Sequence, residues 1–134
     1  MRRTALIGGA IVALFLLSAP GALLSRAWAG PWEDGMAAYN RGDYVPAIRL
    51  FRPLAEQGNP KAQSVIGAMY RKGQGVAKSS ARAFMWFSLA SKRGDAKAKA
   101  ELREVSLDMT QAELSQARQM MQACEASDYR ACEY

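Results

Sequence analysis

Apolar residues recur at intervals of three and four positions through most of the chain after residue 30, and no segment alternates steadily between apolar and polar residues. This spacing places the apolar side chains on one face of successive α-helices, whereas a half-buried strand would need an interval of two. One predicted helix carries Ala62 and Ile66 on its apolar face, and the next carries Phe84, Phe87 and Ala90. The pattern therefore predicts an all-α fold.

The chain contains an internal repeat. The segments "AIRLFRPLAEQGNPKA" (residues 47–62) and "AFMWFSLASKRGDAKA" (residues 83–98) align without a gap at an offset of 36 residues. Chance matches in an alanine-rich chain would not keep one register over the whole segment, so the alignment predicts a repeated helix–turn–helix unit. The matched pairs include Ala47 and Ala83, Phe51 and Phe87, Gly58 and Gly94, and Lys61 and Lys97.

Both copies end in the same helix-to-helix junction. Gly58 suits the left-handed residue that follows a helix, Asn59 can cap the next helix, and Pro60 fits its first turn, where no amide donor is needed. The second copy repeats this arrangement with Gly94 and Asp95. We therefore expect one helix to end and the next to begin at once at each junction.

The segment from residue 62 to residue 98 resembles the Sel1-like repeat, a relative of the tetratricopeptide repeat. The positions that match its pattern are Ala62, Ile66, Gly67, Met69, Tyr70, Gly73, Gly75, Val76, Ala83, Trp86, Ala90, Gly94 and Ala98. The resemblance implies a short α-solenoid of antiparallel helix pairs, with about two to three repeats and a C-terminal capping helix. Members of this family generally act as adaptors in protein complexes, and in bacteria often outside the cytoplasm.

The repeat domain is expected over residues 30–124. Its units fall at about 31–58, 59–94 and 95–124, and a tail follows over residues 125–134. The first unit lacks the Gly-x-Gly loop of the second and is shorter. In the last unit, Thr110 with Glu113 three residues later forms a capping box, which predicts the start of the closing helix.

The stretch "RKGQGVAKSS" (residues 71–80) has the composition of a phosphate-binding loop but not the required spacing. A P-loop follows a strand and reads G-x-x-x-x-G-K before serine or threonine, whereas Lys78 here lies three residues after Gly75 and the preceding segment is helical. Gly73 and Gly75 instead suit positive φ angles in a connector between two helices. No nucleotide or other cofactor is expected.

Residues 1–29 read as a cleaved secretory signal peptide, because Arg2 and Arg3 precede an apolar run and Ala27-Trp28-Ala29 forms a small-x-small cleavage site. We therefore expect a mature protein that begins at Gly30, is periplasmic or secreted, and has no stable membrane span. Removing this segment lowers the formal net charge from +6 to +3. The lower charge and the export signal both argue against a nucleic-acid partner.

The sequence offers little catalytic chemistry. It has no histidine, which removes the commonest general base and metal ligand, and its two cysteines cannot alone form a zinc site. In an exported protein, Cys124 and Cys132 are best interpreted as a structural disulfide, although free thiols or a bond to another chain stay open at this point. Glu101 and Glu104 share a helical face and support one alternative, a cell-wall-associated hydrolase or regulator that uses surface carboxylates.

The family resemblance implies that a partner binds on the first helix of each unit. In the second unit, Ile66 and Tyr70 lie on the apolar face. The opposite, solvated side is therefore expected to carry Lys61, Ser64, Ala68 and Arg71. The candidate partner-binding residues are Glu33, Asn40, Arg41, Lys61, Ser64, Arg71, Lys72, Lys97 and Glu104. Their mildly basic balance favours an acidic protein or peptide. We therefore expect a non-catalytic adaptor or scaffold module of the cell envelope, without a metal.

Overall fold

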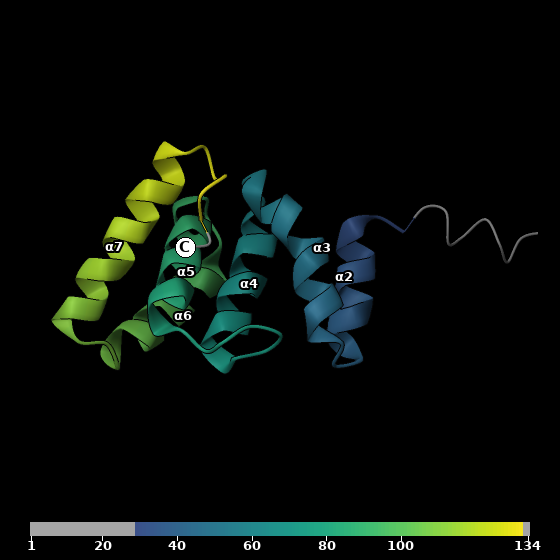
Figure 1. The fold of residues 1–134 in the computed structure, drawn as a ribbon, viewed down its shortest axis with the longest axis horizontal. Coiled ribbons are helices and arrows are strands. Elements are labelled where there is room, and N and C mark those ends of the chain that lie inside the picture. The colour runs from purple at the N-terminus through teal and green to yellow at the C-terminus, as the bar shows by residue number, and fades with distance from the viewer. Residues whose placement is uncertain (1–28, 133–134) are drawn as a thin grey trace, which may run out of the picture.

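The computed structural model describes residues 29–132, and within that range it contains six helices and no strand (Figure 1). The helices are α2 (Pro31–Asn40), α3 (Tyr44–Glu56), α4 (Pro60–Lys72), α5 (Ser80–Lys92), α6 (Ala96–Leu107) and α7 (Gln111–Ala126). The all-α prediction is confirmed. The signal peptide expected over residues 1–29 lies, except for its last residue, outside the described range.

Successive helices pack side by side and form a short solenoid. Helix α2 contacts α3, α3 contacts α4, α4 contacts α5, and α5 contacts α6. Figure 1 shows this order along the long axis of the molecule, from α2 at one end to α7 at the other. Helices α2 to α6 therefore bury their apolar faces mainly against their neighbours in sequence, as expected for a repeat stack.

The helix junctions form as the sequence predicts. Gly58 and Gly94 adopt φ angles of 82° and 90°, in the left-handed region that glycine tolerates best. The Asn59 side chain accepts hydrogen bonds from the backbone N–H groups of Lys61 and Ala62 at the start of α4. Asp95 caps α6 in the same way. Local sequence chemistry therefore determines where these helices end and begin.

The glycine loop between α4 and α5 is a connector that also contacts the preceding helix pair. Gly73 and Gly75 have φ angles of 69° and 70°. A Cβ atom at Gly75 would lie 2.7 Å from the carbonyl carbon of Tyr44, so only glycine fits where the loop crosses the start of α3. The Tyr39 hydroxyl donates a hydrogen bond to Oε1 of Gln74, at 3.1 Å. The loop, which belongs to the second unit, thus also contacts the first unit.

Helix α5 is the centre of the core. It contacts α4, α6 and α7, and these neighbours leave Met85, Trp86, Phe87 and Leu89 at most 1% exposed. The spacing of apolar residues places Phe84 on the same face as Phe87, but Phe84 is only half-buried. The difference arises because α5 is covered from several sides, so burial along it does not follow a single helical face.

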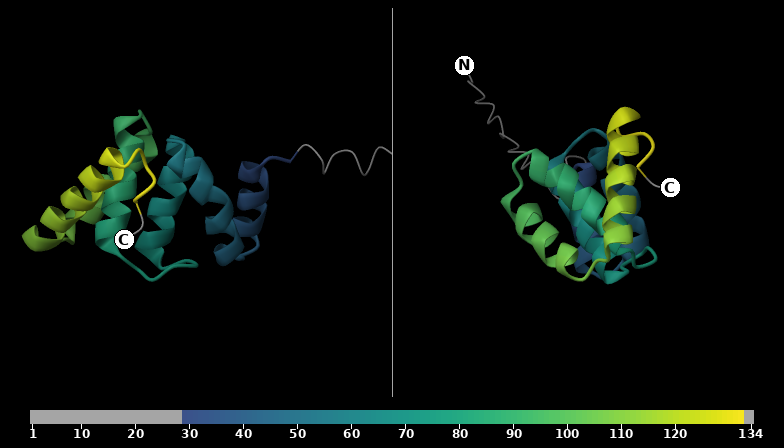
Figure 2. Two further views of the ribbon diagram at one scale, coloured as in Figure 1. Left: turned by 45° about the horizontal axis from the view of Figure 1, so that its top comes forward. Right: turned by 90° about the vertical axis from the view of Figure 1, so that its left-hand side faces the viewer.

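Helix α7 packs against α5 rather than pairing closely with α6. The right-hand view of Figure 2 shows α6 and α7 diverging after the short turn that joins them. The buried residues of α7 are the small Ala117 and Cys124, which allow a close approach. Residues 95–124 therefore do not form a close helix pair like α4 and α5, and α7 acts as the cap of the stack.

The capping box at the start of α7 is confirmed. The Thr110 hydroxyl accepts from the backbone N–H of Glu113, and the Glu113 carboxylate accepts from the backbone N–H of Thr110 at 2.7 Å. The backbone and hydroxyl donors of Thr110 hold the pKa of Glu113 below its usual value. Both interactions satisfy groups that a helix terminus would otherwise leave unpaired.

The C-terminal tail folds back onto the end of the stack. A disulfide joins Cys124 to Cys132, whose Cα atoms lie 4.4 Å apart. The Tyr129 hydroxyl accepts a hydrogen bond of 2.7 Å from Arg93, and the same guanidinium group lies 5.0 Å from the centre of the Tyr129 ring. Lys92 also forms a 2.8 Å ion pair with Glu125. The tail and α7 are therefore both linked to the C-terminal end of α5.

Replacing Gly67 with leucine should lower the free energy of unfolding by roughly 1–3 kcal/mol through overpacking, even though leucine favours helix more than glycine does. A Cβ atom at Gly67 would lie 2.8 Å from the ring of Phe87, which is fully buried. Urea denaturation measures the change. The control Ala100→Leu, on the exposed side of α6, should stay within about 0.5 kcal/mol. Equal and negligible effects would contradict a close helix contact at Gly67.

Candidate functional site

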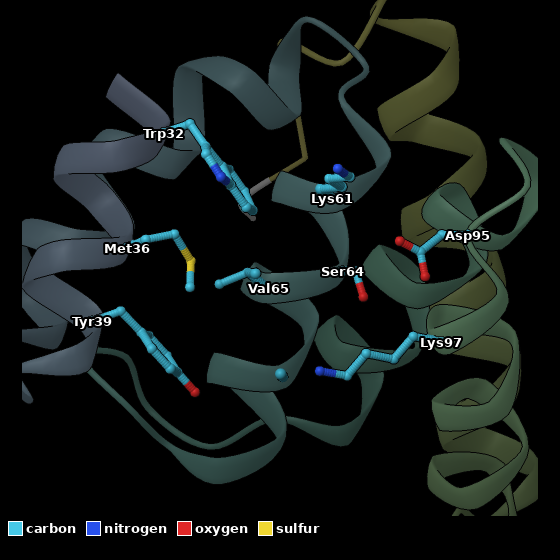
Figure 3. Close-up of a pocket in the computed structure, with 9 residues that line it drawn as sticks. Trp32, Met36, Tyr39, Lys61, Ser64, Val65, Asp95 and Lys97 are labelled. Carbon is cyan, nitrogen blue, oxygen red and sulfur yellow. The ribbon is translucent and has the colours of Figure 1, made fainter. Parts of the chain in front are cut away.

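A hollow of about 250 Å³ opens on the side of the molecule formed by the first helix of each unit. Figure 3 shows α4 in the middle, with side chains from α2 on one side and from the start of α6 on the other. The hollow therefore spans helices from three consecutive units. Its lining residues are Trp32, Met36, Tyr39, Lys61, Ser64, Val65, Ala68, Asp95 and Lys97.

Helix α2 supplies the apolar wall with one edge of its single, broad apolar face. Gly35 lies against α3, where a Cβ atom would lie 2.6 Å from the Phe51 ring. Trp32, Met36 and Tyr39 recur beside it at four- and three-residue intervals, and Figure 3 shows all of them directed into the hollow. The Trp32 ring also lies 5.3 Å from the Phe51 ring, so this wall continues the contact with α3. These side chains stay half-exposed, because the described residues provide no further helix to cover them.

A second hollow, of about 570 Å³, adjoins the first and shares Tyr39, Ala68 and Lys97 with it. We call the two together the α4 groove, since α4 lines both from near its first residue to its last. The residues that only the second hollow adds are Arg71, Lys72, Lys78 and Glu101.

The α4 groove is electropositive. Its two carboxylates are already engaged: Glu101 forms an ion pair with Arg71, and Asp95 accepts a 2.7 Å hydrogen bond from the backbone of Ala98. The remaining charged side chains are lysines, and none of them forms an ion pair with another residue in the range 29–132. These lysines are Lys61, Lys72, Lys78 and Lys97.

The structure brings together five of the nine partner-binding candidates. The five that line the α4 groove are Lys61, Ser64, Arg71, Lys72 and Lys97. Ser64 differs from the expectation of a solvated position: it is only 6% exposed, because the elements on both sides of α4 cover it. Whether these residues bind a partner stays a prediction.

The other four candidates lie outside the groove. Glu33 accepts a hydrogen bond from the Gly30 backbone at the start of α2, and Arg41 pairs with Asp43 in the following turn. Asn40 and Glu104 are exposed and line neither hollow. Glu101, three residues before Glu104 on α6, does line the groove.

Sequence reasoning missed the apolar residues of the groove. A partial signal was present in the segment 31–40, where Trp32, Met36 and Tyr39 recur at helical spacing and make the apolar face broad. Val65 on α4 could not be found in this way, since its spacing does not distinguish a half-covered position from a core position. The missed lining residues are Trp32, Met36, Tyr39, Val65, Lys78, Asp95 and Glu101.

Neither a metal site nor a membrane-spanning helix is found in the part of the chain that the structure describes. No group of three or more histidine, cysteine or acidic side chains lies close enough there to hold a metal ion. Between residues 29 and 132, no helix has the length and apolar character that crossing a bilayer requires.

Comparison with protein families gives an independent result. The Sel1 repeat model matches two adjacent segments of the chain, residues 35–59 and 60–95. The first segment covers most of α2 and all of α3, and the second covers α4, the glycine loop and α5. The boundary between them falls at the Asn59–Pro60 junction. The match supports assignment of this chain to the Sel1-like repeat family.

Proposed function

We propose that this chain, which carries two Sel1 repeats, is a non-catalytic adaptor that binds a protein or peptide along the α4 groove. Sel1 repeats generally mediate protein–protein interactions. The observation that carries the proposal is the groove itself, which crosses the first helices of successive units and leaves large apolar side chains accessible beside lysines. Repeat stacks commonly use such an extended surface for partners.

The cell envelope is the proposed location. The segment 1–29 has the features expected of a secretory signal. The bond between Cys124 and Cys132 supports the same location, because structural disulfides persist in oxidising compartments and are rare in the cytosol.

The alternative of a cell-wall hydrolase or regulator gains no geometric support. A pair of catalytic carboxylates has to face one substrate position. Here the Glu101 carboxylate accepts from the Arg71 guanidinium, while Glu104 is exposed and lies outside the groove. The Sel1 repeat is also typically an interaction module rather than a catalytic one.

Site-specific crosslinking in intact cells tests the adaptor proposal. A photoreactive amino acid at Ala68, in the groove, should form a discrete adduct with an envelope protein, which mass spectrometry identifies. The same amino acid at Gln119, on the exposed side of α7, should not form that adduct. If Gln119 captures the protein as well as Ala68 does, the partner does not bind in the groove. If Ala68 captures no protein under conditions that crosslink a known complex, the proposal is wrong.

A further inference from the structure

The two ends of the α4 groove differ in chemistry. Near the start of α4, the hollow lies between Trp32 and Met36 of α2 and Val65 of α4, and its lining is mostly apolar. Figure 3 shows these three side chains directed toward one another across the hollow. A large apolar side chain of a partner would find contacts here from two helices. This end is suited to one apolar anchor.

The other end of the groove is basic. Lys72 and Lys78 lie near the end of α4 and in the loop after it. Lys97 of α6 lines both hollows, and Figure 3 shows its side chain extending toward α4. All three are exposed and have no carboxylate partner within the described residues. Three cations in one hollow repel one another, so carboxylates placed between them would be stabilised. This end is suited to acidic side chains.

The dimensions of the groove favour an extended segment. The apolar hollow, of about 250 Å³, is smaller than the ~300–1,000 Å³ typical of pockets that hold a whole drug-sized ligand. A helix, about 10 Å across, could place only single side chains in it. Along α4, the path from Lys61 to Lys72 measures roughly 17 Å at ~1.5 Å per residue, which about five extended residues would span.

We infer that the α4 groove recognises an extended acidic segment of a partner protein, with one large apolar side chain held between Trp32, Met36 and Val65. Two or more carboxylates of the same segment, within about five residues of the anchor, lie against Lys72, Lys78 and Lys97. This inference rests on the adaptor function proposed above. It adds the chemistry of the bound segment, which repeat architecture alone does not specify.

Short synthetic peptides test this chemistry directly. The probes are fluorescein-labelled Leu-Ser-Asp-Glu-Asp and its reverse sequence, titrated against the purified protein by fluorescence polarisation. One of the two orientations should bind. Replacing Leu by Ala, or the three acidic residues by Asn and Gln, should each weaken binding by about tenfold or more. Raising the salt from about 50 mM to about 200 mM should also weaken binding, because the contacts are between exposed charges.

Matched variants locate the binding site. Lys97→Glu should weaken binding of the acidic probe by about tenfold or more, whereas Lys99→Glu, an equal charge change on the exposed side of α6, should have a much smaller effect. Met36→Glu should also weaken binding. Its control is Val45→Glu, at a position on α3 that is 49% exposed and outside the groove. Circular dichroism and urea midpoints check that all four variants remain folded.

The possible outcomes separate the inference from the proposed function. Loss with Lys97→Glu and Met36→Glu, but not with their controls, supports both. If the neutral probe binds as tightly as the acidic probe, and Met36→Glu still weakens that binding, the partner segment need not be acidic. The inference is then wrong, but the adaptor proposal is not. If neither orientation of the acidic probe binds, the inference is wrong. The adaptor role is then tested separately, by crosslinking at Ala68. If Ala68 crosslinks only to a second copy of this chain, the groove is a self-interface and both proposals fail.

Discussion

Replacing Trp86 with alanine should lower the free energy of unfolding by about 3–5 kcal/mol, the largest effect that we expect from a single substitution in this protein. Trp86 is fully buried on α5, the helix that contacts α4, α6 and α7. Removing its ring leaves a cavity in the core around α5, which close-packed neighbours fill only in part. Because small domains are stabilised by only about 5–15 kcal/mol in total, the variant should be close to unfolding at physiological temperature.

Two control variants make this prediction specific. Trp86→Phe should cost much less, because it keeps most of the buried ring and removes an indole N–H that has no hydrogen-bond partner among the described residues. Leu107→Ala, at a position that is 78% exposed, should change stability by less than about 0.5 kcal/mol. Urea midpoints at an unchanged m-value measure all three. A loss for Trp86→Ala no larger than that for Leu107→Ala would contradict the central position of α5.

Removing the disulfide should lower the free energy of unfolding by roughly 2.5 kcal/mol, from the chain entropy of a closed ring of about nine residues. Helix α7 covers one side of α5 and has no neighbour beyond it in the described stack, so the tail that ends at Cys132 limits fraying there. The contact between Tyr129 and Arg93 should loosen together with the tail. Thermal unfolding with and without dithiothreitol measures the difference.

The double variant Cys124→Ala with Cys132→Ala is the matched control. It should be less stable than the oxidised protein, and dithiothreitol should not change its midpoint any further. Mass spectrometry under non-reducing conditions should show a monomer lighter by two hydrogens and a peptide linking Cys124 to Cys132. A covalent dimer, or two thiols that alkylate on the freshly isolated protein, would show that this bond does not form in the cell.

The helix junctions were predictable because their causes are local. A positive φ angle at Gly58, a cap from Asn59 and the capping box of Thr110 with Glu113 each involve residues no more than three positions apart. Such interactions depend on backbone geometry that a short segment determines on its own. The role of the glycine loop as a connector follows from the same reasoning, although its contact with Tyr44 does not.

The groove was only partly predictable, because exposure depends on which neighbours cover a helix. Lys61 and Lys97 could be placed on the first helices from the repeat offset of 36 residues. Trp32 and Met36 are residue types that usually lie in a core. Their side chains stay partly accessible to solvent because α2 lies at the end of the described stack. Ser64 shows the opposite case, a polar residue that the elements around α4 cover.

The sequence by itself determined the all-α class, the repeat and the ends of its helices, because these follow from apolar spacing and from capping within a few residues. Only the tertiary structure decided that α7 leaves α6 and packs on α5, and that α2, α4 and α6 enclose a groove with an apolar and a basic end. The physical reason is that burial is a property of pairs of surfaces. A helical pattern shows which face is apolar, but not which partner covers that face or how much of it remains open.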